Sequence, residues 1–378
     1  MSFFQNQDKV VALIFRLTLF FWLVTKLMSY PLWLGTHVFP MAPYFSFMPA
    51  FPAFLHYVLF GGSLLGLLFL MLKPTNRIVL ISLIIIEIVQ LIPDQNRWQP
   101  YILQFIFTGI LFDLYRKKPA LFTANMAFYS ACLYLHSGLH KLNGGFLFHV
   151  WERMILHQFL GFDVSIAEQP IVHYSGLALG VFEVIGALGV FFARKKFFYA
   201  WVLVGMHIFI LVFISPSGID YNSIVWPWNI LMMAILPLIF YHKTERASLH
   251  FNFKHPKTLL LGLFLLVLPF LSFVDYYDNY LAFNLYSGRL KQFDICVGKP
   301  DEAPDLQVFE TKKRTYCDTK TVLQTNVWHI RETNTVVYPE IRVYRQIADS
   351  LKMRYPKAEL SFCIYQYPYK AANIIYFD

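Results

Sequence analysis

A short polar segment, "SGLHKLNGGF" at residues 137–146, follows a long apolar run and contains two residue types that could do chemistry, histidine and lysine. His136 and His140 are four residues apart, so a helix places them on one face, at a spacing that also suits a divalent metal ion. The segment offers no third ligand of known position, and we therefore favour hydrogen bonding at the membrane interface and predict no metal site. The ordinary interpretation of Lys141 is a lysine that extends its ammonium group towards the membrane surface.

Three ionisable residues, Glu87, Glu183 and His207, lie far inside apolar stretches. An ionisable group at such a depth costs several kcal/mol unless it is paired or hydrated. Direct pairing, for instance of Glu183 with His207, would be a structural solution. A polar cavity inside the membrane would be a functional one.

The stretches that must position these residues are predicted membrane spans. The 378 residues are 57% hydrophobic and 15% charged, with a mean hydropathy of +0.48, which is too apolar for a soluble domain. The net charge of +9 does not indicate nucleic-acid binding, because no basic stripe with interleaved aromatic residues is present. A run of about 17 to 22 apolar residues crosses a hydrocarbon layer of about 30 Å. Such runs are predicted at residues 10–30, 52–72, 78–92, 101–115, 120–140, 171–192, 197–215, 223–241 and 259–273, of which the third and fourth are short.

Basic residues recur at every second connection between these nine runs. They are Lys9, Lys73, Arg77, Arg116, Lys117, Lys118, Arg194, Lys195, Lys196, Lys243, Arg246, Lys254 and Lys257. The excess of lysine and arginine on cytoplasmic loops therefore predicts a cytoplasmic N-terminus and a C-terminus outside. The first run lacks a small-residue cleavage site and is interrupted by Arg16 and Lys26, so we interpret it as a retained anchor.

This topology places most of the unusual polar residues in the outer half of the membrane. The external loop "IPDQNRWQP" at 92–100 supplies Arg97, and "VWPWN" at 225–229 supplies Trp228 and Asn229. Each has an ordinary explanation, since tryptophans gather at membrane interfaces and Arg97 could form a capping pair with Asp94. Chance would distribute such groups over both halves of the membrane. Their accumulation on one side favours a common site.

From residue 276 onward the sequence changes to a polar, charged segment that we predict to be a small external α+β domain, separate from a transmembrane domain at 1–275. One amphipathic helix is expected from Pro339 to about Arg354, with proline in its first turn. Three of the four cysteines lie in this domain, at Cys296, Cys317 and Cys363. In an oxidising compartment one disulfide and one leftover thiol are expected, and three pairings are open. We predict that Cys296 joins one of the other two.

Several segments, in this order, resemble a known family. They are "IFRLTLFF" at 14–21, "DQNRWQPY" at 94–101, "YLHSGLHKLNGGFLFHVWERM" at 134–154, "VLVGMHIFILVF" at 202–213 and "IVWPWN" at 224–229. Together they are similar to the vitamin K-dependent γ-carboxylases and their bacterial relatives, the horizontally transferred transmembrane (HTTM) family. The resemblance covers roughly the first 290 residues. It implies an all-α polytopic bundle in a bacterial inner membrane.

The resemblance also implies a chemistry. In the γ-carboxylases a lysine that aligns with Lys141 is the base that deprotonates a quinol, and the preceding lysine is His140 here. Lysine is a base only when unprotonated, and removal from water in an apolar cavity favours the free amine by lowering its pKa from about 10.4. The expected cofactor is a lipid quinone or quinol, which carries the redox chemistry itself. In this hypothesis His136 and His140 tune the lysine, and Arg97, Glu183, His207, Trp228 and Asn229 bind the cofactor.

The sequence departs from the family in two places and keeps other functions open. The large external region that grips the protein substrate in animal carboxylases is absent or replaced by a domain of about 100 residues, and Phe146 stands where a tryptophan is usual. The expected activity is therefore a quinol-dependent carboxylase or oxidoreductase acting at the outer face. The alternative is a non-enzymatic membrane subunit or assembly factor that docks a partner protein through its outer domain. A transporter would require ionisable groups that continue into the inner half and broken helices in two related halves, which the sequence lacks.

Overall fold

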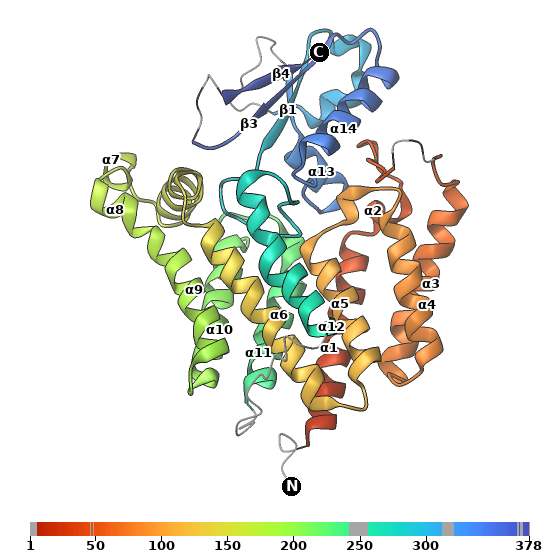
Figure 1. Ribbon diagram of the computed structural model, residues 1–378. Helices are drawn as coiled ribbons and strands as arrows, with labels where there is room; N and C mark the ends of the chain where they lie inside the picture. Colours follow the sequence, from red (N-terminus) through yellow and green to blue (C-terminus); the bar gives the residue numbers. More distant parts are fainter. Residues whose placement is uncertain are drawn as a thin grey trace.

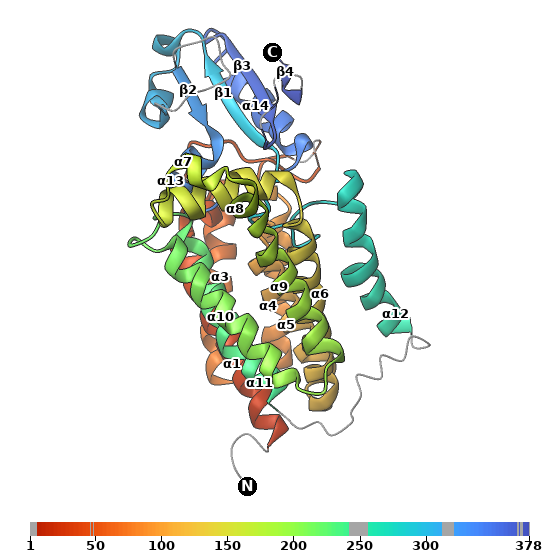
Figure 2. The ribbon, with the colours of Figure 1, turned by 90° about the vertical axis from the view of Figure 1, so that its left-hand side faces the viewer.

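The chain forms a bundle of long helices with a small sheet-containing unit at one end (Figure 1). The computed structural model describes residues 6–45, 47, 49–241, 256–311, 321–368, 370 and 373–377. Helix accounts for 68% of it, and the sheet is small and antiparallel, so the predicted combination of a helical bundle with an α+β unit is confirmed. Helix α1 (Gln7–Met28) begins at the end of the bundle opposite the sheet unit, as Figure 1 and Figure 2 show.

The bundle helices follow the predicted apolar runs closely, usually to within a few residues. They are α1 (Gln7–Met28), α3 (Ala53–Leu72), α4 (Arg77–Leu91), α5 (Pro100–Tyr115), α6 (Pro119–His140), α9 (Leu177–Phe192), α10 (Lys196–Ile214), α11 (Trp226–Phe240) and a last helix through α12 (Pro256–Gly262), η5 (Leu263–Val267) and η6 (Leu268–Val274). Short helices join them: α2 (Tyr30–Leu34), η2 (Gln95–Arg97), η3 (Phe146–Phe159), α7 (Val164–Ala167), α8 (Pro170–Ser175) and η4 (Ser223–Val225).

Local sequence sets where several of these helices begin. The side chain of Asn6 accepts a hydrogen bond from the backbone N–H of Lys9, and that of Asn76 accepts one from Val79. Each asparagine thereby satisfies a backbone donor that has no partner in the first turn. Proline stands in the first turn of α2, α5, α6, α8 and α11, where its missing N–H costs nothing.

Among the residues that the structure describes, six helical segments are long and apolar enough to cross a membrane. They are 7–28, 53–72, 170–192, 196–214, 223–240 and 257–274. Helix α5 is apolar but shorter, at 16 residues. The chain is thus an integral membrane protein by the length and composition of its helices.

The two connections α3–α4 and α5–α6, together with α9–α10, lie at the end of the bundle opposite the sheet unit (Figure 1). These connections carry basic residues, including Lys73, Lys117 and Lys195. These basic connections, which are every second connection in the sequence, therefore lie together at one end of the bundle.

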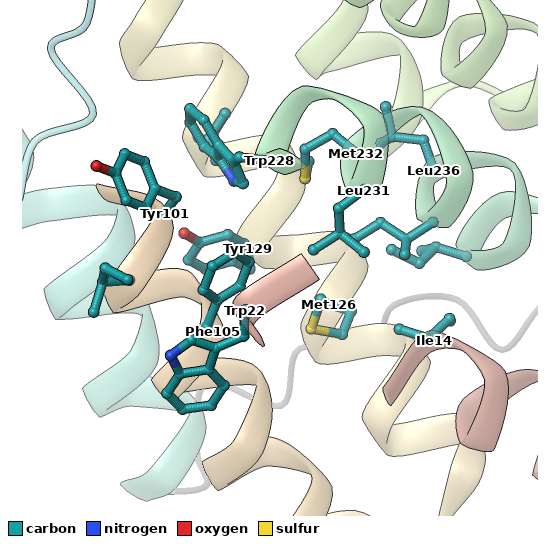
Figure 3. Packing of buried hydrophobic residues seen from close by; sticks show 14 of the residues in the cluster. Ile14, Trp22, Tyr101, Phe105, Met126, Tyr129, Trp228, Leu231, Met232 and Leu236 are labelled. Atoms are coloured by element: carbon teal, nitrogen blue, oxygen red, sulfur yellow. The ribbon is translucent and has the colours of Figure 1, made fainter. Parts of the chain in front are cut away.

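The core of the bundle forms where α1, α5, α6 and α11 meet (Figure 3). Trp22 of α1 stacks on Phe105 of α5 with ring centroids 5.8 Å apart, and Phe15 stacks on Phe112 at 3.9 Å. All four rings are almost completely buried. The outward faces carry exposed apolar side chains such as Leu65, as expected for helices that contact lipid.

The sheet unit contains four antiparallel strands in the order β2-β1-β3-β4. Their bounds are β1 (Gln292–Val297), β2 (Thr321–Gln324), β3 (Leu360–Tyr365) and β4 (Ile375–Phe377). The central pair aligns Asp294 with Cys363, and alternate residues of β1 face α14 (Ile341–Arg354). This helix matches the amphipathic helix predicted at 339–354 except at its start, because Glu340 is the N-cap and Pro339 lies before the helix. Helix α13 (Thr325–Thr333) completes the unit.

The core of the sheet unit includes Phe39 and Ala42 from the connection between α2 and α3. The carboxylate of Glu332 on α13 accepts hydrogen bonds from the backbone N–H groups of Val38 and Phe39. In the other direction, Phe283 packs into the core of the bundle. Chain segments on both sides of the predicted boundary at residue 275 therefore share cores, and the boundary itself stays a prediction.

The cysteines follow the expectation of one disulfide and one leftover thiol in the outer unit. Cys296 is disulfide-bonded, whereas Cys363 and the bundle cysteine Cys132 are free and buried. A bond between Cys296 and Cys363 is thereby excluded. The fourth cysteine, Cys317, lies outside the described residues.

Candidate functional site

A cavity of about 300 Å³ opens inside the bundle between α6, α9, α10 and α11. The π-helix η3 and residues 283–286 complete its wall. Most of the lining is apolar. The polar lining residues are Tyr134, Ser137, Lys141, Glu183, His207, Trp228, Asn229 and Tyr286.

The side chain of Lys141 turns back along α6 and not out towards the membrane surface. Its Nζ donates hydrogen bonds to Ser137 Oγ at 2.7 Å and to Glu183 Oε2 at 2.6 Å. Ser137 lies one helical turn earlier, on the side of the bundle interior. The interpretation of Lys141 as a lysine that reaches for the interface is therefore wrong. Its side chain is only 12% exposed, and that of Glu183 only 5%.

Close contact between α6 and α9 brings the two charged residues together. A Cβ atom built on Gly138 would lie 2.7 Å from the Gly180 carbonyl oxygen, and one built on Gly180 would lie 2.8 Å from the Gly138 carbonyl oxygen. Only glycine allows two helix backbones to approach so closely. Lys141 and Glu183 each lie three residues after one of these glycines, so the ion pair is built beside the contact.

A chain of hydrogen bonds connects Tyr134, His207 and Asn229 deeper in the cavity. The Asn229 amide Nδ2 donates to the Val225 carbonyl at 2.8 Å, which directs Oδ1 towards His207 Nδ1 at 2.7 Å. His207 therefore carries its hydrogen on Nδ1, and its Nε2 accepts the hydroxyl hydrogen of Tyr134 at 2.6 Å. In place of the predicted pairing of Glu183 with His207, Glu183 pairs with Lys141, and His207 bonds to Tyr134 and Asn229.

The cavity reaches the lipid-facing surface of the bundle between α9 and α10. Of its lining residues, Phe182 on α9 is 60% exposed, and Val202 and Phe209 on α10 are also exposed. At their connected ends the two helices touch through Gly189 and Tyr199, so the opening lies nearer the outer end, where Phe182 and Phe209 are exposed. An apolar chain in the membrane could reach the polar wall by this route.

Helix η3 covers the outer end of the cavity. It lies across the bundle and is seen nearly end-on beside α8 in Figure 1. Phe146 and Ile155 are buried and line the cavity. Glu152 is buried and pairs with His173, whereas Arg153 is exposed.

His136 and His140 are not part of the cavity. Both face the last helix, where His136 Nε2 bonds to the Leu266 carbonyl at 3.1 Å and His140 Nε2 bonds to Ser272 Oγ at 3.2 Å. Pro269 has no N–H and leaves carbonyls of the preceding turn without their helical partner. His136 supplies a donor there. The predicted role of these histidines in tuning Lys141 is replaced by one in holding the last helix to α6.

Arg97 also lies elsewhere, in a second polar cluster between α1, α2, α3 and α4. Its guanidinium donates to the carbonyls of Leu32 and Gln90, each at 2.8 Å. Burial lowers the pKa of Arg97 to about 10. The same cluster contains a fully buried ion pair in which Lys26 Nζ lies 2.8 Å from Glu87 Oε1. Arg97 thus fixes the outer loop to the bundle and does not line the cavity.

Of the residues predicted from the sequence, the cavity brings together Lys141, Glu183, His207, Trp228 and Asn229. Sequence reasoning missed Tyr134, Ser137 and Tyr286. The signal was present for the first two, because Tyr134, Ser137 and Lys141 are spaced to share one face of α6. Within the described ranges, no group of three or more His, Cys, Asp or Glu side chains could hold a metal ion.

Comparisons with protein-family models, with curated proteins and with solved structures found no match to this chain. Interpretation of the cavity therefore depends on its own geometry and chemistry.

Proposed function

We propose that this membrane protein binds a lipid quinol in the cavity and acts at the outer face as a quinol-dependent carboxylase or oxidoreductase, with Lys141 and Glu183 as its base. One observation carries the proposal: the Lys141 ammonium group faces an apolar cavity that reaches the lipid. An anchoring lysine would direct its charge to water, since a buried charge is costly.

The cavity suits a quinol by the chemistry of its lining. Its walls are largely apolar, as a ring with a lipid tail requires, and its polar groups are confined to one side. When bound, the quinol supplies the redox chemistry. The Lys141 Nζ donates a hydrogen bond to the Glu183 carboxylate across 2.6 Å, so we assign proton acceptance to the pair and not to Lys141 alone. The cover formed by η3 limits water at this pair.

Orientation in the membrane is part of the same proposal. With nine spans, the basic end of the bundle faces the cytoplasm, and the sheet unit and Lys141 lie towards the outside of a bacterial inner membrane. Labelling with a membrane-impermeant thiol reagent tests this. Cysteine at Lys195 should react only from the cytoplasmic side and cysteine at the exposed Met353 only from outside. Reaction of position 195 from outside would overturn the orientation.

Native purification followed by lipid extraction and mass spectrometry tests the ligand. Co-purification of a quinone at near one per chain is expected. Absence of quinone together with a stably bound protein would instead support the non-enzymatic alternative, a membrane subunit or assembly factor that docks a partner through its outer unit. Lys117→Ala, at the opposite end of the bundle, is a control that should leave the quinone content unchanged.

A further inference from the structure

The hydrogen bonds at the deep end of the cavity have a defined direction. The Val225 carbonyl fixes the Asn229 amide, the amide fixes His207, and His207 Nε2 holds the hydrogen of the Tyr134 hydroxyl. The Tyr134 oxygen then has only lone pairs left for a ligand. At this end of the cavity, the Tyr134 oxygen can accept a hydrogen bond from a ligand but cannot donate one.

The outer end of the cavity differs because it can both donate and accept. Glu183 offers carboxylate oxygen, whereas Ser137 accepts from Lys141 at Oγ and keeps its own hydroxyl hydrogen for a ligand. This end can therefore bind either a hydroxyl or a carbonyl group. The Tyr286 hydroxyl accepts a hydrogen bond from Asn222 Nδ2 and also keeps its own hydrogen for a ligand. Discrimination between the two groups therefore comes from Tyr134.

We propose that Tyr134, held by His207 and Asn229, binds a second hydroxyl group of the ligand and sets the specificity of the cavity. The inference rests on the proposed function, because it concerns the same cavity. Tyr134 and Ser137 are three residues apart on α6, which is a rise of about 4.5 Å along the helix axis. A single ring that lies along the cavity wall can therefore form hydrogen bonds with both. The ligand is thus a ring with hydroxyl groups at both ends.

A carbonyl group at the deep end would face the Tyr134 oxygen without a hydrogen between them. Leaving a buried acceptor unpaired weakens binding by about tenfold. The dihydroxy form of a quinone should therefore bind about tenfold more tightly than its dicarbonyl form. His207 and Asn229 are positioning residues in this scheme, since they act only through Tyr134.

The test measures binding of a short-chain 1,4-naphthoquinol and of its quinone to the full chain in lipid nanodiscs under anaerobic conditions. Quenching of tryptophan fluorescence reports binding, because Trp228 lies on the cavity wall. In Tyr134→Phe we expect quinol affinity to fall about tenfold and quinone affinity to stay constant. Tyr129→Phe is the matched control, with the same change on the same helix outside the cavity lining, and it should leave both affinities unchanged.

His207→Leu provides a second, opposite readout. It frees the Tyr134 hydrogen to turn towards the ligand, so quinone binding should strengthen relative to quinol. A merely structural role of His207 would weaken both forms equally. An unchanged quinol-to-quinone ratio in Tyr134→Phe would overturn the inference while leaving the proposed function intact. Failure of wild-type protein to bind either form would remove the proposed function and the inference with it.

Discussion

Two lysine–glutamate pairs lie inside the bundle, and their surroundings differ. Lys26 of α1 pairs with Glu87 of α4, and both side chains are 0% exposed. Lys141 of α6 pairs with Glu183 of α9, at 12% and 5% exposure. The first pair is closed in by protein on all sides, whereas the second lines a cavity of about 300 Å³.

The Lys26–Glu87 pair forms its hydrogen bonds with groups of the protein itself. Lys26 donates to both oxygens of Glu87 and to Gln90 Oε1, and its Nζ lies 3.8 Å from the ring centroid of Trp33. Ser63 donates to the same carboxylate. Pairing explains why a charge is tolerated inside a bundle, but free space beside the pair decides whether that charge is available to a ligand.

The largest effect on stability is expected from Glu87→Leu. It leaves the Lys26 ammonium buried without a counter-charge, which typically costs about 3 to 5 kcal/mol. Thermal unfolding of the purified protein and its yield in the membrane measure the loss. The double variant Lys26→Met with Glu87→Leu should recover most of it, because an apolar pair needs no counter-charge. Equal instability of the single and double variants would contradict the charge argument.

A smaller loss is expected from Gly138→Ala. The added Cβ would lie 2.7 Å from the Gly180 carbonyl oxygen, so α6 and α9 must separate, at a cost of about 1 to 3 kcal/mol. Separation also lengthens the Lys141–Glu183 contact, and quinone content should fall. Gly205→Ala on α10 is the control, because a Cβ there meets nothing within 4 Å. Unchanged melting temperature and quinone content in Gly138→Ala would show that the close contact is not required.

Substitution of Lys141, in the pair that lines the cavity, should affect stability less and function more than substitution of Glu87. Lys141→Ala and Lys141→Arg are expected to fold and insert, with a stability loss smaller than that of Glu87→Leu because this pair is partly exposed and the Lys26–Glu87 pair is fully buried. Activity should be lost in both variants, since arginine keeps the charge but is not deprotonated in proteins. The melting temperature measures stability, and conversion of added quinol to quinone measures activity. Wild-type function in both variants would leave Lys141 with a structural role only.

The smallest effect is expected from His136→Gln. Glutamine retains an N–H donor for the Leu266 carbonyl, so stability should change by less than about 1 kcal/mol. Quinone binding should be unaffected, because His136 lies outside the cavity lining. Loss of quinone in this variant, with a normal melting temperature, would show that His136 contributes to quinone binding.

Prediction from the sequence worked best where one residue property acts alone. The limits of α6 and α14 follow from apolar length and from helical periodicity, and the structure places both as expected. For the site, five predicted residues line the cavity, because an ionisable or aromatic residue at a given depth needs a polar environment. Arg97, His136 and His140 are also ionisable residues in or beside apolar stretches, yet they form other contacts.

The sequence by itself determined that this protein crosses a membrane, that its basic connections gather at one end and that a small α+β unit follows the helices. These properties depend on composition and local periodicity along the chain. Only the tertiary structure decided that Lys141 meets Glu183 and that His207 meets Tyr134. The first two residues are 42 positions apart in the sequence, and the second two are 73 positions apart. The direction of a side chain and the free space beside it depend on how helices pack, as the contact of Gly138 with Gly180 shows.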